Sequence, residues 1–173
     1  SMEEAASDTY RRANSTRSSN AADHCTAFAL CGAATRAGTP MAGQNQDVSL
    51  AMAEFGLVVR LQPSDGRPAA LMFTWAGQLG YHGLNEHGVT HFANGLTGGP
   101  RGIPAIPHYP LKRACLEQRS VAECEALLKV QPVSSSGNMV FADGAGAVAD
   151  VEISPNTCVP LSAEHAFKGS FLH

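Results

Sequence analysis

The chain consists largely of short runs of β-favouring residues that alternate with clusters of turn-forming residues. These runs occur in pairs at 25–48, 55–77, 77–96 and 134–155, and Gly, Pro, Asn or Asp residues stand between the members of each pair. Paired runs of this length, separated by such residues, form β-hairpins. The pattern therefore predicts a mainly antiparallel sheet.

A different spacing appears between the third and fourth pairs. Residues 111–130 carry apolar side chains at helical intervals in two pieces. Ser120 is expected to cap the second piece, with Glu123 three residues later. The segment from Pro100 to Pro110 contains four prolines and is predicted to be irregular, like the tail after residue 155. The predicted fold class is α+β, with helices covering an antiparallel sheet.

The start of the chain differs in composition from the rest. Residues 1–24 are rich in Ser, Asn, Ala and Arg and lack hydrophobic periodicity, so they are predicted to be a flexible leader that begins with a cloning remnant, Ser1 and Met2. Residues 25–173 are predicted to form one domain, because a chain of this length with 44% hydrophobic residues can bury one core.

Charge and hydropathy exclude several classes of partner. Only 16% of the residues are charged and the net charge is -3, so we expect neither nucleic-acid nor membrane-surface binding. Apolar runs such as 69–76 are far shorter than the roughly 20 residues that span a bilayer. The five cysteines include no CxxC pair, which argues against a disulfide framework and indicates a reducing compartment such as the cytoplasm.

Three histidines lie close together in the sequence, His82, His87 and His91. Glycines around them break any helix that could bring them to one face, and no cysteine or carboxylate completes a usual coordination set. We predict structural roles for these histidines, no metal site and no other cofactor.

Cys25 stands where the polar leader meets the first predicted strand. Cleavage of the His24–Cys25 peptide bond would give this cysteine a free α-amine, whose reference pKa is about 8. Such an amine can accept the thiol proton, so one residue would supply both nucleophile and base. On the residue alone, a small buried side chain at the start of a strand is the favoured interpretation of Cys25.

Four blocks strengthen the catalytic interpretation: DHCTAFAL at 23–30, GQNQD at 43–47, GLNEHGVTHFANGL at 83–96 and SGNMVFADGAGAVADVEISP at 136–155. In order and spacing they resemble the acyl-CoA:6-aminopenicillanate acyltransferase family of N-terminal-nucleophile (Ntn) hydrolases. The resemblance implies an αββα sandwich of two antiparallel sheets between helices. Relatives continue past the position of residue 173 into a long part with a functional arginine, so we expect an incomplete sandwich and a fragment.

The resemblance also implies roles for individual residues. Cys25 would be the nucleophile released by self-cleavage, Asp47 the acidic residue near it, and Asn138 the side-chain amide of the oxyanion hole. Asn45 would support the strand near the nucleophile. Gln46 replaces a family tryptophan, which would make the acyl pocket smaller or more polar. Without the resemblance, Asp47 would be a loop-capping carboxylate and Asn138 an asparagine that closes a turn.

Three aromatic residues, Phe73, Trp75 and Phe92, are candidates for an apolar acyl pocket, although core packing would also explain them. The predicted activity is cleavage of a small-molecule amide or an acyl-CoA thioester through an acyl-enzyme on Cys25. The acyl group would pass to water or to an amine.

Two alternatives stay open at this point. One is a papain-like thiol hydrolase with a separate base such as His91 or His165. The other is a catalytically inactive Ntn fold that serves as a binding module. In either case a sheet cut short would expose an edge strand, which could pair with a missing C-terminal part or with a second copy.

Overall fold

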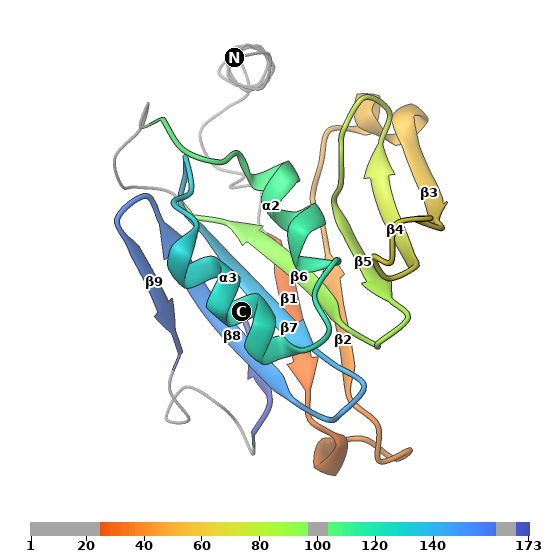
Figure 1. Ribbon diagram of the computed structural model, residues 1–173, viewed down its shortest axis with the longest axis vertical. Helices are drawn as coiled ribbons and strands as arrows, with labels where there is room; N and C mark the ends of the chain where they lie inside the picture. Colours follow the sequence, from red (N-terminus) through yellow and green to blue (C-terminus); the bar gives the residue numbers. More distant parts are fainter. Residues whose placement is uncertain (1–24, 97–103, 162–168) are drawn as a thin grey trace.

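The computed structural model describes residues 25–96, 104–161 and 169–173. These residues form three layers: two helices, a seven-stranded sheet and a three-stranded sheet behind it (Figure 1). The strands are β1 (Thr26–Leu30), β2 (Met41–Asn45), β3 (Gly56–Leu61), β4 (Ala70–Trp75), β5 (His82–Asn85), β6 (Thr90–Gly95), β7 (Gly137–Ala142), β8 (Val148–Ser154), β9 (Thr157–Pro160) and β10 (Phe171–Leu172). The helices are α2 (His108–Cys115) and α3 (Val121–Val130), with 3-10 turns η1 (Gly32–Ala34) and η2 (Leu50–Phe55).

The seven-stranded sheet is an antiparallel meander in which β3 to β9 lie in sequence order. All four predicted hairpins are present, as β1–β2, β3–β4, β5–β6 and β7–β8. The link from β6 to β7 carries both helices. No helix within the described ranges is long and apolar enough to cross a membrane.

Alternation of side chains gives the large sheet two different faces. The outer face packs on α2 and α3 through one apolar cluster; among its members are Val89, Ala93, Leu111, Cys124, Leu128, Met139, Phe141 and Val151. The inner face packs on the three-stranded sheet through Ala27, Ala29, Phe92 and Val140. Alanines on β1 let the two sheets approach closely, because they add little volume between the layers.

The three-stranded sheet, in the order β10-β1-β2, covers only part of the inner face. β1 and β2 lie behind β6, β7 and β8, whereas β3, β4 and β5 extend to one side (Figure 1). On this side the inner face is open, and Val58 and Leu71 are 72% and 46% exposed. The edge of the small sheet therefore meets an uncovered apolar surface.

The helices agree with the sequence pattern except at the start of α2. Ser120 caps α3, since its Oγ accepts a bond from the Glu123 amide at 3.2 Å, and the Glu123 carboxylate accepts one from the Arg119 amide at 2.7 Å. The prediction of an irregular segment up to Pro110 is wrong at its end, because α2 begins at His108. Pro110 fits there because first-turn amides have no partner within the helix.

Asn85 explains the GLNEHG turn between β5 and β6. Its side-chain oxygen accepts bonds from the amides of His87 and Val89, each at 3.0 Å. Its amide nitrogen donates to the carbonyl oxygens of Leu116 at 3.0 Å and Gln118 at 2.6 Å. One buried side chain thus closes the hairpin and ties it to the end of α2.

The tail is more regular than predicted, since it contains β9 and β10. Pro155 and Asn156 form the turn into β9, and Ser154 and Thr157 share a hydroxyl bond of 2.8 Å across it. The α+β class and the two antiparallel sheets are confirmed. In the described ranges helices cover only the outer face of the large sheet, so the second helical layer of an αββα sandwich is not seen there.

Candidate active site

Cys25 immediately precedes β1, and the alternation of that strand indicates where its side chain lies. Ala27 and Ala29 are completely buried against the large sheet, whereas Thr26 between Cys25 and Ala27 is exposed. Side chains two apart in a strand share a face. Cys25, which is half-buried, therefore faces the space between the two sheets.

Gln46 and Tyr81 are the neighbours of Cys25 on this side. Thr26 pairs with Asn45, so one step further the register sets Cys25 opposite Gln46. The Gln46 amide nitrogen donates to the Tyr81 hydroxyl. Burial raises the pKa of Tyr81, and the charge of a Cys25 thiolate adds to the increase. The phenol is therefore neutral and lies close to the cysteine.

A chain of side-chain amides, half-buried at Gln44 and buried at Asn94 and Asn138, links the two sheets. Gln44 Nε2 donates to the Ala93 carbonyl oxygen at 2.6 Å and to Asn94 Oδ1 at 3.1 Å. Asn94 Nδ2 in turn donates to Asn138 Oδ1 at 3.1 Å. These bonds join β2, β6 and β7 across the interface between the two sheets.

Asn138 is completely buried on the inner face of β7 and donates through Nδ2 to Asp150 Oδ1. The other Asp150 oxygen lies 3.6 Å from His173 Nδ1. Burial raises the pKa of Asp150, although the Asn138 amide opposes the increase. Because a side-chain amide carries two hydrogens, Asn138 keeps one N–H beyond its bond to Asp150.

The same network reaches the strand that begins after Cys25. Asn94 Nδ2 lies 3.3 Å from the His173 carbonyl oxygen. His173 exchanges two backbone bonds with Ala27, of 2.9 and 2.8 Å. Asn138 is thereby linked, through Asn94 and His173, to a residue two positions from Cys25.

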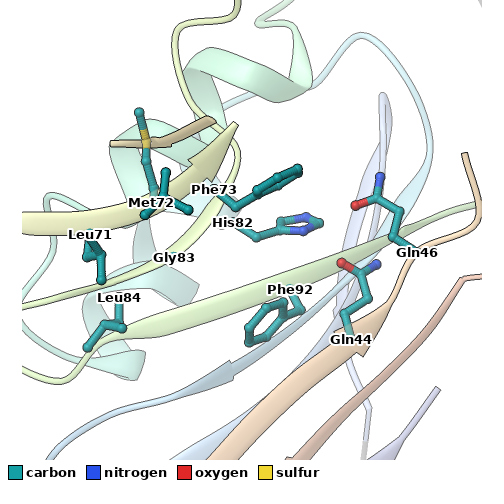
Figure 2. A pocket seen from close by; sticks show the side chains of 10 residues that line it. Gln44, Gln46, Leu71, Met72, Phe73, His82, Gly83, Leu84 and Phe92 are labelled. Atoms are coloured by element: carbon teal, nitrogen blue, oxygen red, sulfur yellow. The ribbon is translucent and has the colours of Figure 1, made fainter. Parts of the chain in front are cut away.

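A pocket of about 380 Å³ opens beside these residues, where β2 meets the uncovered part of the large sheet (Figure 2). Phe73 and Phe92 line it, and so do Gln44 and Gln46. Trp75 lies outside the lining; the residue is 5% exposed, and its indole packs edge-on against Phe73 with ring centroids 5.0 Å apart. Two of the three predicted pocket aromatics therefore border one cavity.

The other predicted site residues are placed less centrally. Asn45 ends β2, pairs with Thr26 through the backbone and has an exposed side chain. Asp47 follows the strand and is exposed. His24 lies outside the described residues. The roles of Asn45 and Asp47 stay predictions.

His91 lies on the outer face, because its neighbours in the alternation, Val89 and Ala93, pack under the helices. Its Nε2 bonds the Lys112 carbonyl oxygen at 2.8 Å, and burial lowers its pKa to about 3. His91 is thus separated from Cys25 by the sheet. His165 lies outside the described residues.

His82 lies on the inner face and lines the pocket, while His87 is in the β5–β6 turn. Among the residues that the structure describes, no three His, Cys, Asp or Glu side chains gather in a way that could hold a metal ion.

The sequence pattern did not indicate Gln44, Tyr81, Asn94 or Asp150 as site residues, and it predicted only a structural role for His82. The sequence does contain a signal for Asn94: it lies two residues after Phe92, so in a strand the two side chains share one face. For Gln44, the side of the small sheet on which its side chain lies depends on the register between β1 and β2, which the sequence does not fix.

Comparisons with known proteins agree with the fold and with the sequence blocks. The family model described as acyl-coenzyme A:6-aminopenicillanic acid acyl-transferase matches residues 34–167. A mutant conjugated bile acid hydrolase from Clostridium perfringens superposes with a TM-score of 0.57 and 17% identity, over 85% of this chain and 52% of that protein. Penicillin V acylase from Agrobacterium tumefaciens gives a TM-score of 0.47 and 11% identity, over 82% and 42%. No curated protein matches the sequence.

The described fold is thus shared with an Ntn hydrolase, and the chain spans about half the length of the solved structures that it matches. The family model covers most of the chain, including β2 to β9. The chain therefore belongs to the acyl-coenzyme A:6-aminopenicillanic acid acyl-transferase family of Ntn hydrolases.

Proposed function

We propose that this protein is a self-processing cysteine hydrolase or acyltransferase that cleaves an amide or thioester through an acyl-enzyme on Cys25. One observation carries the proposal: Cys25 immediately precedes β1 and faces the same space between the two sheets as Gln46 and the side-chain amide network. Family membership supports the same chemistry, since an N-terminal-nucleophile enzyme needs its cysteine at the start of a strand between two sheets.

Activation begins with the Cys25 thiol attacking the carbonyl carbon of His24. The peptide C–N bond breaks as the C–S bond forms, and the amine of Cys25 takes up the proton. Water then hydrolyses the thioester and releases the leader with a new carboxylate. The liberated α-amine, with a reference pKa of about 8, is the base that the thiol needs.

In the main reaction the amine takes the thiol proton and the sulfur attacks the substrate carbonyl. Negative charge develops on the carbonyl oxygen, and the remaining N–H of Asn138 is the proposed donor to it. The leaving amine departs with the proton from the Cys25 ammonium group, which leaves a thioester. Water or an acceptor amine then removes the acyl group.

The pocket supports an apolar acyl group. Phe73 and Phe92 border it, and the open inner face beyond continues with Val58, Leu71 and Leu84. The family description names an acyl-CoA donor and a penicillin nucleus, and the superposed bile acid hydrolase acts on conjugated bile acids. An amide or thioester with an apolar acyl part is the class we propose here. We also propose that a second helical layer completes an αββα sandwich.

The papain-like alternative with His91 as base has no support, because this imidazole lies across the sheet from Cys25. A non-catalytic binding module is separated from the proposed enzyme by the test below.

The test is release of 4-nitroaniline from phenylacetyl-4-nitroanilide by the purified chain. Wild-type protein and Cys158→Ala should hydrolyse it at similar rates, since Cys158 is a half-buried thiol on β9. Cys25→Ala should be inactive. Equal rates in Cys25→Ala and wild type, or no hydrolysis by any of the three, would contradict the proposal.

A further inference from the structure

Tyr81 immediately precedes β5, and contacts from three elements fix its ring. The residue is 7% exposed. The indole of Trp75 on β4 packs edge-on against the ring with centroids 4.6 Å apart, and the imidazole of His82 on β5 lies at 3.9 Å. From α2, the ammonium nitrogen of Lys112 lies 3.8 Å from the ring centroid, over the face of the ring. A ring packed in this way holds its hydroxyl group in a constant direction.

The Tyr81 hydroxyl uses only one of its two hydrogen-bonding capacities. Its oxygen accepts a bond from the side-chain nitrogen of Gln46. Gln46 lies opposite Cys25, one step beyond the Thr26–Asn45 pair. A phenol that accepts one bond still has its own hydrogen to donate. Within the described ranges no acceptor takes this hydrogen, so a fixed and buried donor is available beside the start of β1.

Cys25 is the group that this donor can serve. Burial raises the pKa of Tyr81, and the charge of a Cys25 thiolate raises it further. The interaction is mutual, because a phenol that keeps its hydrogen favours the negative charge on the sulfur. The sulfur changes position by rotation about the single Cα–Cβ bond of the cysteine, whereas the ring of Tyr81 is fixed.

Lys112 makes the hydroxyl a stronger donor. A cation over the ring face draws electron density from the ring and its oxygen, which makes the O–H more acidic. The same nitrogen lies 5.7 Å from the ring centroid of Tyr109, so Tyr81 is the nearer of the two rings. Among the residues that the structure describes, the titratable groups around Tyr81 are Lys112 and Tyr109 on α2, His82 on β5 and Cys25.

We propose that the Tyr81 hydroxyl donates a hydrogen bond to the sulfur of Cys25 once the thiol has lost its proton. The thiol proton goes to the α-amine, as in the proposed function, and the Tyr81 hydrogen stays on the phenol oxygen. The bond increases the fraction of thiolate at neutral pH and makes the sulfur a somewhat weaker nucleophile. The inference deepens the proposed function by adding a residue to its first step, and it rests on that function in treating Cys25 as the nucleophile.

The test is the rate at which iodoacetamide alkylates Cys25 at pH 7.0 and at pH 10. Peptide mass spectrometry reads the label on Cys25 apart from the other cysteines and separates chains that are cut before Cys25 from uncut ones. Tyr81→Phe removes the hydroxyl but keeps the ring and its contact with Lys112. Tyr109→Phe makes the same change on α2 and is the matched control.

The expected result is a change of sign between the two pH values. Loss of a hydrogen bond to a charged group lowers the ratio of thiolate to thiol about tenfold, and the released sulfur gains about threefold in reactivity. Tyr81→Phe should therefore react about threefold more slowly than wild type at pH 7.0. At pH 10, where thiolate predominates in both, it should react about threefold faster. Tyr109→Phe should match wild type at both pH values.

Equal rates in Tyr81→Phe and wild type at both pH values would overturn the proposal. Equal slowing at both would also overturn it, because damage to the fold or to access does not reverse with pH. Circular dichroism checks that both variants are folded. Alkylation requires neither self-cleavage nor turnover, so a protein that shows the reversal without hydrolysing the anilide would contradict the proposed function and support the role of Tyr81.

Discussion

Asn94 donates its side-chain amide to Asn138 Oδ1 at 3.1 Å, and this bond fixes the orientation of the Asn138 amide from one side. Asp150 fixes it from the other by accepting from Nδ2. An amide held at both ends cannot rotate to present its oxygen, so its remaining N–H keeps a constant direction. This is the condition that a preorganised oxyanion donor requires.

We therefore expect Asn138→Ala to reduce kcat by about 100-fold with little change in KM, since the lost bond exists mainly in the transition state. The measurement is steady-state hydrolysis of phenylacetyl-4-nitroanilide. Asn156→Ala, the same substitution in the exposed β8–β9 turn, is the control and should leave kcat unchanged. A rise in KM alone in Asn138→Ala would show that the residue binds the ground state.

Asn85→Ala should destabilise the fold by about 3 kcal/mol, because one buried and one partly buried carbonyl group and two turn amides lose their partner. Urea unfolding followed by circular dichroism gives the value. Asn156→Ala serves again as the matched control and should change the free energy of unfolding by less than about 0.5 kcal/mol. Similar losses in the two variants would refute the linking role of Asn85.

A glycine pair tests the packing of two hairpin turns. Gly88 has φ of +75°, and a Cβ there would lie 2.7 Å from the Gly144 amide nitrogen. Gly66 has φ of +84° with nothing within 4 Å of its Cβ position. Both alanine variants carry the backbone strain of a positive φ, but only Gly88→Ala adds a clash. The free energy of unfolding should therefore fall by at least about 1 kcal/mol more in Gly88→Ala than in Gly66→Ala. Equal losses in urea unfolding would contradict the close approach of the turns.

The stability of the fold should fall in mild acid. The folded-state pKa values of His91 and His108 are lowered to about 3 and about 4 by burial, whereas in the unfolded chain both take up protons near pH 6.5. The unfolded state thus binds more protons below pH 6.5, so stability is complete above that pH and decreases as the pH falls toward 4. At pH 5 the loss should be about 2 kcal/mol for each residue.

Urea unfolding at pH 7.5 and pH 5.0 measures this loss. Asp150 acts in the opposite direction, since its raised pKa favours the protonated folded state and offsets part of the decrease. His91→Gln retains an N–H donor for the Lys112 carbonyl and should reduce the difference between the two pH values, while His87→Gln should not. If His91→Gln leaves the difference in stability between pH 7.5 and pH 5.0 unchanged, His91 is excluded as a source of the acid destabilisation.

Local signals in the sequence were sufficient to predict the hairpins and the cap of α3. The β3–β4 and β7–β8 pairs follow alternation and turn chemistry that act over a few residues, and Ser120 with Glu123 caps a helix from within one turn. The start of α2 differs from the prediction because proline is unfavourable in the interior of a helix but not in its first turn. Pro110 lies in the first turn, where it is tolerated.

The site could be predicted only in part because it depends on register and on layer contacts. Asn45 and Asp47 were chosen from a motif, but the pairing of Ala27 with Gln44 shows which residues of β2 face inward. A shift of one residue would reverse the two faces. The short strand β10 has too few residues for any periodic signal, and it forms through pairing with β1 far away in the sequence.

The most direct test of the account is the intact mass and N-terminal sequence of the purified chain after incubation at neutral pH, for wild type and Cys25→Ala. The account predicts that wild-type protein yields a chain that begins at Cys25 and that Cys25→Ala keeps its original N-terminus. A wild-type chain that stays intact, or a variant that is cut at the same bond at the same rate, would contradict the role of Cys25 as a self-released nucleophile.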